Sequence, residues 1–367
     1  MKEPHRILLL ALLPIGDSLF ATPTIRALRE RYPRAEITAL VHASTASLMR
    51  SVPGVDNVRI LPTNGDWRGV RHLIRFLRHL RAHHFDVAID FTSPAYKWIS
   101  IVAGIPVRTY MKFDRLWWLI PGRHSAWRQT HATQHYYNCA RELGLPPWNE
   151  VDHRISLAVS PGARDKAERY LHSHQVGNEC RPVVAIHAGA RGLGEMKRWP
   201  AERYAEVSRT LQRDWHADIV LVGGEEDREI AQHIATMLEE PPLITAGELS
   251  LLESLVLLER VALFIGNDSS LLHAAAALGT PYIGIYGPTA PANFHPIPRE
   301  LGQGSIVMPP VPCKHPHYFV GGDVIWANPR CDGPGESLLD ISPEMVEEQA
   351  QRLLRKRLKA LQPLTGA

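Results

Sequence analysis

Short apolar runs alternate with amphipathic segments along most of the chain, and the alternation occurs twice. Four strands and four helices are expected in the first half: strands 6–13, 36–41, 57–61 and 86–90, and helices 21–32, 44–50, 67–82 and 133–143, with a less regular stretch over 91–150. The second half repeats the rhythm, with strands 183–188, 218–223, 242–245, 261–265 and 282–286 and helices 200–214, 225–238, 250–259 and 268–278. Such alternation predicts parallel sheets covered by helices on both faces. We therefore expect an α/β protein of two Rossmann-like doubly wound domains, facing across a ligand cleft at the carboxyl ends of their strands.

The length of 367 residues suits two cores better than one. An N-terminal domain is predicted over 1–165 and a second over 175–342, with 159–162 in the connecting region. A terminal helix over 343–361 begins at Ser342-Pro343-Glu344, where serine suits the cap and proline the first turn. We expect this helix to pack back on the N-terminal domain.

The N-terminus is similar to a signal peptide, because Lys2 and Arg6 precede a run of apolar residues. The run stops at Pro14 and is followed by a helical pattern, so a first buried strand is the better interpretation. No apolar run of 18 residues occurs, and nothing is expected to span a membrane. With only four cysteines, the chain suits a reducing compartment, and we expect it to be cytoplasmic.

Four candidate metal ligands lie in a region rich in proline and glycine: Cys313, His315, His317 and Cys331. Their spacing matches none of the usual structural zinc patterns, so a surface loop is the competing interpretation and no metal is assigned.

Charge is distributed unevenly between the two halves. Residues 1–150 contain 20 Lys or Arg and 11 Asp or Glu, whereas the other 217 contain 21 and 27. The basic half predicts an anionic partner. Helix 67–82 has arginines on one side, which by default is a solvated face, and segment 108–119 places cations beside Trp117 and Trp118. That combination favours a membrane interface, so we expect peripheral contact with the inner membrane and no nucleic-acid partner.

Asn267-Asp268-Ser269-Ser270 separates an apolar run from an alanine-rich helix former. A helix beginning there offers backbone N–H groups and a positive dipole end to an anion such as a diphosphate. The alternative is an ordinary capped helix. Lys197, at the start of another helix after strand 183–188, could reach the same phosphate oxygens, which favours the anion site.

After the first strand the chain turns through Gly16-Asp17 and has no G-x-G-x-x-G pattern, so a nicotinamide dehydrogenase has little support. Asp17 is expected at the strand tip, where a helix dipole favours its ionised form. Capping of helix 21–32 is an equally good interpretation of Asp17.

Five segments in order make the chain similar to a known family. They are Ile15-Gly16-Asp17-Ser18-Leu19 with Pro23, Lys197-Arg198-Trp199-Pro200, Gly223-Gly224-Glu225, Asp268 to Gly279, and Tyr286-Gly287-Pro288-Thr289. Together they resemble glycosyltransferase family 9, the lipopolysaccharide heptosyltransferases. The resemblance covers nearly the whole chain and implies a GT-B fold, an N-terminal acceptor domain and a C-terminal donor domain.

The resemblance also implies roles for individual residues. Asp17 would be the general base and Lys197 would neutralise the leaving ADP, in an inverting transfer that uses no metal or cofactor. The donor ADP-L-glycero-β-D-manno-heptose would be bound by Gly189, Ala190, Lys197, Gly223, Gly224, Glu225, Glu226, Leu249, Asp268, Ser269, Ser270, Leu271 and His273. An anionic glycolipid acceptor, a Kdo- or heptose-bearing core, would be bound by Gly16, Ser18, Arg108, Lys112 and Arg115.

Two departures from the family pattern leave alternatives open. Ser270 stands where the family usually has glycine, and Ala290-Pro291 follows Thr289 where the family commonly has Asp-Pro. Another nucleotide-sugar donor, a protein acceptor, or a catalytically silent sugar-nucleotide-binding paralogue would each fit the same resemblance. The presence of Asp17, Lys197 and Asp268 speaks against the silent paralogue.

Overall fold

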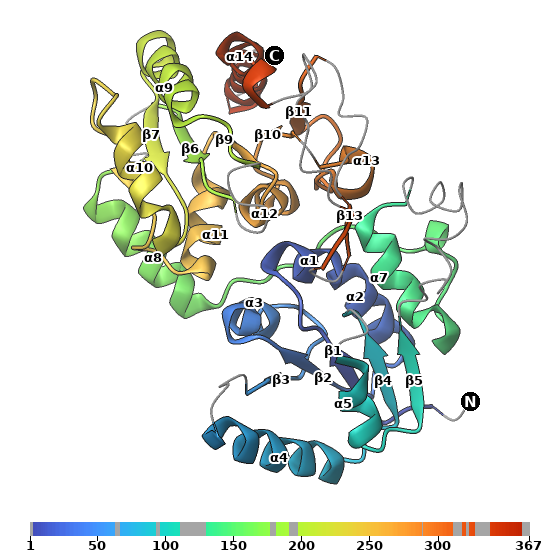
Figure 1. The fold of residues 1–367 in the computed structure, drawn as a ribbon. Helices are drawn as coiled ribbons and strands as arrows, with labels where there is room; N and C mark the ends of the chain where they lie inside the picture. Colours follow the sequence, from blue (N-terminus) through green and yellow to red (C-terminus); the bar gives the residue numbers. More distant parts are fainter. Residues whose placement is uncertain are drawn as a thin grey trace. The chain divides into compact units, whose positions relative to one another are not determined.

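The computed structural model divides into two compact units (Figure 1). It describes residues 3–62, 67–92, 96–110, 130–176, 181–190, 197–287, 289–310, 318–320, 323–326 and 338–361. The first unit contains Met1–Ala158, Ala292–Phe294 and Tyr318–Trp326, and the second contains Val159–Pro291, His295–His317 and Ala327–Ala367. The first break in the chain between the units is thus at Ala158, slightly before the boundary expected from sequence.

The first unit is built on a five-stranded parallel sheet in the order β3-β2-β1-β4-β5. Its strands are β1 (Arg6–Leu10), β2 (Glu36–Val41), β3 (Asn57–Ile60), β4 (Val87–Asp90) and β5 (Val107–Tyr110). The central β1 is fully buried from Ile7 to Leu10, as continuous apolar runs in parallel sheets are. β12 (Tyr318–Val320) and β13 (Asp323–Trp326) form a separate antiparallel pair that also belongs to this unit.

Helices connect these strands: α1 (Ile15–Phe20), α2 (Thr22–Arg31), α3 (Ala46–Arg50), α4 (Trp67–Ala82), α5 (Lys97–Val102) and α7 (Ala132–Ala140). Short 3-10 turns lie at Ala43–Thr45, Arg141–Leu143 and Trp148–Glu150. The single helix expected over 21–32 is two helices that meet at Ala21, and the first of them already begins at Ile15. Asp17 lies in the first turn of α1, and the N-cap of α2 is Ala21, so Asp17 does not cap helix 21–32.

The second unit has a six-stranded parallel sheet in the order β11-β10-β9-β6-β7-β8. Its strands are β6 (Val183–His187), β7 (Asp218–Leu221), β8 (Leu243–Ile244), β9 (Leu263–Asn267), β10 (Tyr282–Ile285) and β11 (Gly304–Val307). Its helices are α8 (Pro161–Ser173), α9 (Ala201–Trp215), α10 (Arg228–Ala235), α11 (Leu251–Arg260), α12 (Ser270–Leu278) and α14 (Pro343–Leu361). The short helix α13 (Pro291–Phe294) is divided between the units, with Pro291 in the second unit and the other residues in the first. Turns at Glu225–Asp227 and Leu338–Asp340 are 3-10 helices.

The sequence prediction did not include α8, which begins at Pro161 within the predicted connecting region. Ser160 accepts a hydrogen bond from the Ala163 N–H, and Pro161 occupies the first turn, which is the position where proline fits a helix. The Pro-Gly pair resembles a turn in sequence but here starts a helix of 13 residues.

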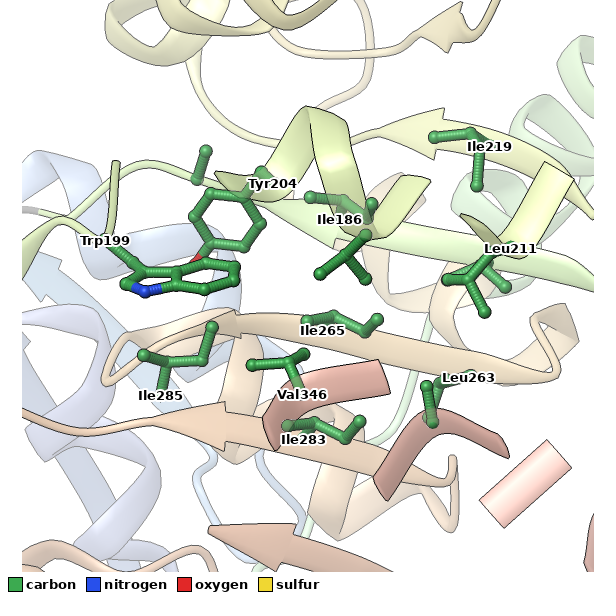
Figure 2. Packing of buried hydrophobic residues seen from close by; sticks show 14 of the residues in the cluster. Ile186, Trp199, Tyr204, Leu211, Ile219, Leu263, Ile265, Ile283, Ile285 and Val346 are labelled. Carbon is green, nitrogen blue, oxygen red and sulfur yellow. The ribbon is translucent and has the colours of Figure 1, made fainter. Parts of the chain in front are cut away.

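One face of the second sheet carries the main core of this unit, with Trp199 and Tyr204 beside branched aliphatic residues (Figure 2). Trp199 is fully buried, and α14 contributes Val346, Ala350, Leu353 and Leu354 to the same cluster. The terminal helix was expected to pack on the N-terminal domain, whereas its buried apolar side chains belong to the core of the second unit. Its apolar stripe covers β9–β11 and α9 instead, because that face of the sheet would otherwise be exposed.

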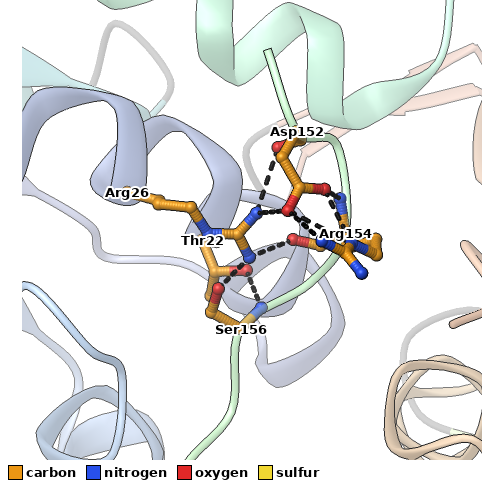
Figure 3. Close-up of polar contacts among 5 residues, drawn as sticks. All are labelled: Thr22, Arg26, Asp152, Arg154 and Ser156. Atoms are coloured by element: carbon orange, nitrogen blue, oxygen red, sulfur yellow. Dashed lines mark hydrogen bonds and ion pairs between the residues drawn. The ribbon is translucent and has the colours of Figure 1, made fainter. Parts of the chain in front are cut away.

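The last residues of the first unit are fastened to α2 (Figure 3). The Arg26 guanidinium pairs with the Asp152 carboxylate at 2.7 Å and donates to the carbonyl of Arg154, while the Ser156 N–H donates to Thr22 Oγ1. Hydrogen bonds from the neighbouring Arg154 lower the pKa of Asp152 to about 2, so its carboxylate is ionised at neutral pH. These contacts fix the path of the chain just before Val159.

Candidate functional site

In the second unit, polar residues gather at the carboxyl ends of β6, β7 and β9. Lys197 Nζ donates to Asp268 Oδ2 at 2.7 Å, and His273 Nε2 lies 3.3 Å from Asp268 Oδ1. Burial alone would raise the pKa of Asp268, but the Lys197 charge and the His273 contact outweigh it and hold the pKa well below its usual range. A lysine and a carboxylate predicted separately from sequence are thus one ion pair.

Asn267 connects the backbone segments that surround this ion pair. Its Oδ1 accepts from the backbone N–H of Trp199 at 3.0 Å and from the Tyr204 hydroxyl at 2.9 Å. Its Nδ2 donates to the backbone carbonyls of Ala188 and Gly189. One fully buried amide therefore holds both the segment after β6 and the segment that presents Lys197. Sequence reasoning did not assign Asn267 a role.

The helix α12 begins at Ser270, with Ser269 as its N-cap and Asp268 just before it. Ser269 and Ser270 are partly exposed, whereas Asp268, Leu271 and His273 are buried. The Ser269 side chain makes no capping hydrogen bond with its own helix, and its Oγ lies 3.0 Å from His187 Nδ1. The start of α12 therefore offers a partly exposed helix terminus with hydroxyls, which is a suitable place for an anion.

Gly189 and Gly223 were both predicted to bind the donor, and in the structure both lie against Asp227. A Cβ at Gly189 would be 1.9 Å from Asp227 Oδ1, and one at Gly223 would be 2.6 Å from Asp227 Cβ. These glycines make room for a buried carboxylate. Gly224 donates its N–H to Asp227 Oδ2 at 2.9 Å, and Ala190 is buried.

The other predicted donor residues lie on the same unit with different surroundings. Glu225 is exposed and pairs with Arg228, Glu226 is also exposed, and the Leu249 N–H donates to the carbonyl of Thr245.

In the first unit, Asp17 accepts a hydrogen bond from a residue that was not predicted from the sequence. Tyr136 of α7 donates its hydroxyl hydrogen to Asp17 Oδ1 at 2.5 Å. The Tyr136 ring is 1% exposed and packs edge-on against Phe91 with centroids 5.8 Å apart. The carboxylate is thus held in place by a rigid, buried phenol.

Asp90 is a second buried carboxyl at the end of β4. Its Oδ1 accepts from the N–H and the hydroxyl of Thr92, and its Oδ2 has no hydrogen-bond partner in the part of the chain that the structure describes. Burial is the largest effect on Asp90 and raises the pKa to about 6 despite the Thr92 hydrogen bonds.

The predicted acceptor residues are only partly described. Gly16 is partly exposed, and Arg108 is exposed and donates to the carbonyl of Ile105. Ser18 is fully buried, so its hydroxyl is not presented at the surface and is a poor acceptor contact in this structure. Lys112 and Arg115 lie outside the described residues, as do the candidate metal ligands Cys313, His315, His317 and Cys331.

The described residues contain no grouping of metal ligands. No set of three or more His, Cys, Asp or Glu among them has the arrangement to hold a metal ion. None of the described helices combines the length and apolar character that crossing a bilayer needs.

Known proteins agree with this architecture. The family model described as "Glycosyltransferase family 9 (heptosyltransferase)" matches residues 73–317. The chain is 31% identical to "Lipooligosaccharide heptosyltransferase 2" of Haemophilus influenzae over 352 residues, covering 93% of this chain and 97% of the relative. It is 26% identical to "Lipopolysaccharide heptosyltransferase 2" of Escherichia coli over 369 residues, covering 93% and 96%.

A solved structure has the same fold at lower identity. "Structure of E. coli ADP-heptose lps heptosyltransferase II" superposes with a TM-score of 0.73 at 23% identity, covering 96% of this chain and 99% of that one. The predicted class, two parallel-sheet α/β domains of GT-B type, is confirmed. The chain is a glycosyltransferase and belongs to glycosyltransferase family 9, the heptosyltransferases.

Proposed function

We propose that this enzyme transfers heptose from ADP-L-glycero-β-D-manno-heptose to a Kdo- or heptose-bearing lipopolysaccharide core, with inversion at the anomeric carbon. The names of its relatives support heptosyl transfer in lipopolysaccharide synthesis, and the E. coli enzyme of the same fold is an ADP-heptose heptosyltransferase. The single observation that carries the proposal is the Lys197–Asp268 pair beside the start of α12.

The donor diphosphate would lie at the start of α12. A lysine ammonium has three hydrogens, so Lys197 can keep its hydrogen bond to Asp268 and still donate to phosphate oxygens. The helix terminus adds backbone N–H groups and a positive dipole end. Together they would stabilise the negative charge that develops on the departing ADP. Asp268 would hold Lys197 in position and contact the sugar.

Asp17 would act as general base. The acceptor hydroxyl oxygen forms a bond to the anomeric carbon, its proton passes to the Asp17 carboxylate, and the bond from the anomeric carbon to the phosphate oxygen breaks as ADP leaves. Because a carboxylate is an intrinsically weak base at neutral pH, proton transfer would come late and together with bond formation.

The acceptor is proposed to be lipid-linked, at the cytoplasmic face of the inner membrane. Supporting this, α4 exposes Arg71, Arg75 and Arg78 on one side. The neighbouring α5 exposes apolar side chains, with Ile101 60% exposed and Trp98 39% exposed. Exposed cations on one helix and an exposed tryptophan on its neighbour suit an anionic lipid surface.

A panel of nucleotide sugars tests the donor. Titration of the purified protein with ADP-heptose, UDP-sugars and GDP-sugars should show binding of ADP-heptose at least about tenfold tighter than the others, roughly 1.4 kcal/mol. Preference for a UDP- or GDP-sugar would instead support another donor, as the departure at Ser270 allows. Product formation with a truncated core acceptor, in the presence of a chelator, then distinguishes a metal-independent enzyme from a silent sugar-nucleotide-binding protein.

A further inference from the structure

Three side chains form a continuous hydrogen-bonded chain in the second unit. Asp227 Oδ2 lies 3.2 Å from His187 Nε2, and His187 Nδ1 lies 3.0 Å from Ser269 Oγ. The residues come from the turn after β7, the end of β6 and the N-cap of α12, so the chain links three neighbouring elements at the carboxyl edge of the sheet.

The inner part of this chain is buried and its outer end is not. Asp227 is 6% exposed and His187 is 5% exposed, whereas Ser269 is partly exposed. The backbone gives Asp227 its space, because a side chain at Gly189 would collide with the carboxylate. The buried carboxylate and imidazole therefore end at the hydroxyl of a partly exposed serine.

Hydrogen-bond chemistry decides which way that hydroxyl points. Burial would raise the pKa of Asp227, but the hydrogen bond and charge of His187 and the Gly224 N–H lower it, so the carboxylate is an acceptor only. His187 Nε2 must then carry a hydrogen. If Nδ1 is bare, Ser269 donates its hydrogen to the ring. If Nδ1 also carries a hydrogen, Ser269 accepts from the ring and its own hydrogen is available to another acceptor.

We propose that Asp227 and His187 are positioning residues that aim the Ser269 hydroxyl at the donor diphosphate, and that the diphosphate binds with His187 protonated on both nitrogens. This inference rests on the proposed donor site. The diphosphate accepts hydrogen bonds and does not donate them. It therefore favours the arrangement in which the Ser269 hydroxyl accepts from His187 Nδ1 and donates its own hydrogen to a phosphate oxygen.

The surrounding charges are those of the same site. Asp227 faces His187 from the turn after β7, and the charge of Arg198 also acts on Asp227. Ser269 is next to Asp268 in sequence, and Asp268 contacts Lys197 and His273.

A double-mutant cycle with ADP as the probe tests the positioning role. Calorimetry should show that Ser269→Ala and Asp227→Asn each weaken ADP binding about tenfold, and that the double variant is weakened little more than either single variant. Asp227→Asn keeps the shape that Gly189 accommodates. Ser208→Ala is the matched control, since Ser208 is a buried hydroxyl of the same unit that donates to the carbonyl of Tyr204. It should lower thermal stability without changing ADP affinity.

Proton uptake is the readout that a purely structural role would not produce. At one pH near neutrality, the apparent enthalpy of ADP binding to the wild type should vary with the ionisation enthalpy of the buffer, and this variation should decrease in His187→Gln. ADP affinity that is unchanged in Asp227→Asn, or additive effects in the cycle, would overturn the inference alone. A wild-type protein that does not bind ADP would overturn the proposed function and the inference with it.

Discussion

Lys197 and Asp268 are 71 residues apart in sequence and form a largely buried ion pair with 2.7 Å between Nζ and Oδ2. Their side chains are 13% and 7% exposed. In such surroundings the two charges depend on each other, because removing one leaves the other largely buried without its ion-pair partner.

Lys197→Met is therefore expected to lower the free energy of unfolding by about 3 kcal/mol and to abolish transfer. Lys197→Met with Asp268→Asn should be clearly more stable than the single variant, while remaining inactive. Urea denaturation of the three proteins measures this. Equal stability of the single and double variants would show that the pair is not coupled.

Asp17→Asn should leave ADP affinity unchanged and reduce turnover by roughly two to four powers of ten, because only the proton acceptor is lost. Glu30→Gln, an exposed carboxylate in the neighbouring α2, is the control and should have wild-type turnover. A turnover of Asp17→Asn close to wild type would remove Asp17 from the mechanism.

Tyr136→Phe should lower kcat/KM about tenfold with ADP affinity unchanged, because the Asp17 carboxylate loses the donor that orients it. Tyr137→Phe is the matched control on the same helix, since the Tyr137 hydroxyl donates to the carbonyl of Pro146. It should affect stability only. If both variants lose activity equally, Tyr136 acts through packing of α7.

Asp90 should make stability depend on pH between about 4 and 6. Its pKa is raised to about 6 in the folded protein from the usual value of 3.8. Within that window the unfolded chain releases the proton while the folded chain keeps it, so the free energy of unfolding falls as pH rises, by about 2–3 kcal/mol, and is level above pH 6. Urea denaturation at several pH values should show this fall in the wild type and not in Asp90→Asn. Parallel profiles would contradict it.

Membrane contact should depend on the exposed side chains of α4 and α5. Replacing Arg71, Arg75 and Arg78 by Glu should abolish flotation with vesicles that contain anionic lipid, and Trp98→Ser with Ile101→Ser should weaken it. The same charge reversal at Arg169, Arg213 and Arg355, three exposed arginines of the second unit, is the control. Wild-type protein that floats no better with anionic than with neutral vesicles would refute membrane contact.

The alternation of apolar runs and helices was enough to predict the parallel sheets, because buried parallel strands have a strong local signal. Strand 36–41 and helices 67–82 and 343–361 have the predicted bounds. α5 and β5 were not predicted, because they lie in the stretch 91–150, where the sequence has no regular alternation of apolar and polar residues. α8 was missed because its first two residues, Pro161 and Gly162, also form turns.

The parts of the candidate site that were proposed from the sequence are those with a local signal. Lys197, Asp268 and Ser269 follow directly from helix starts near strand ends. His187, Asp227, Asn267 and Tyr136 were missed because each acts through a partner at least 40 residues away in sequence. The position of each at a strand end or on a helix would have been visible, but only the fold shows which of them meet.

The division of the chain into units has a consequence for hybrid enzymes. Asn293 donates to the carbonyl of Thr130, and Phe294 packs against Phe20, so Ala292–Phe294 form part of the first unit. In a chimera that joins this N-terminal half to a relative's C-terminal half at Ala158, the relative's residues would replace Ala292–Phe294 in the first unit. Exchange of acceptor specificity should therefore succeed only when Ala292–Phe294 and Tyr318–Trp326 are inherited together with residues 1–158.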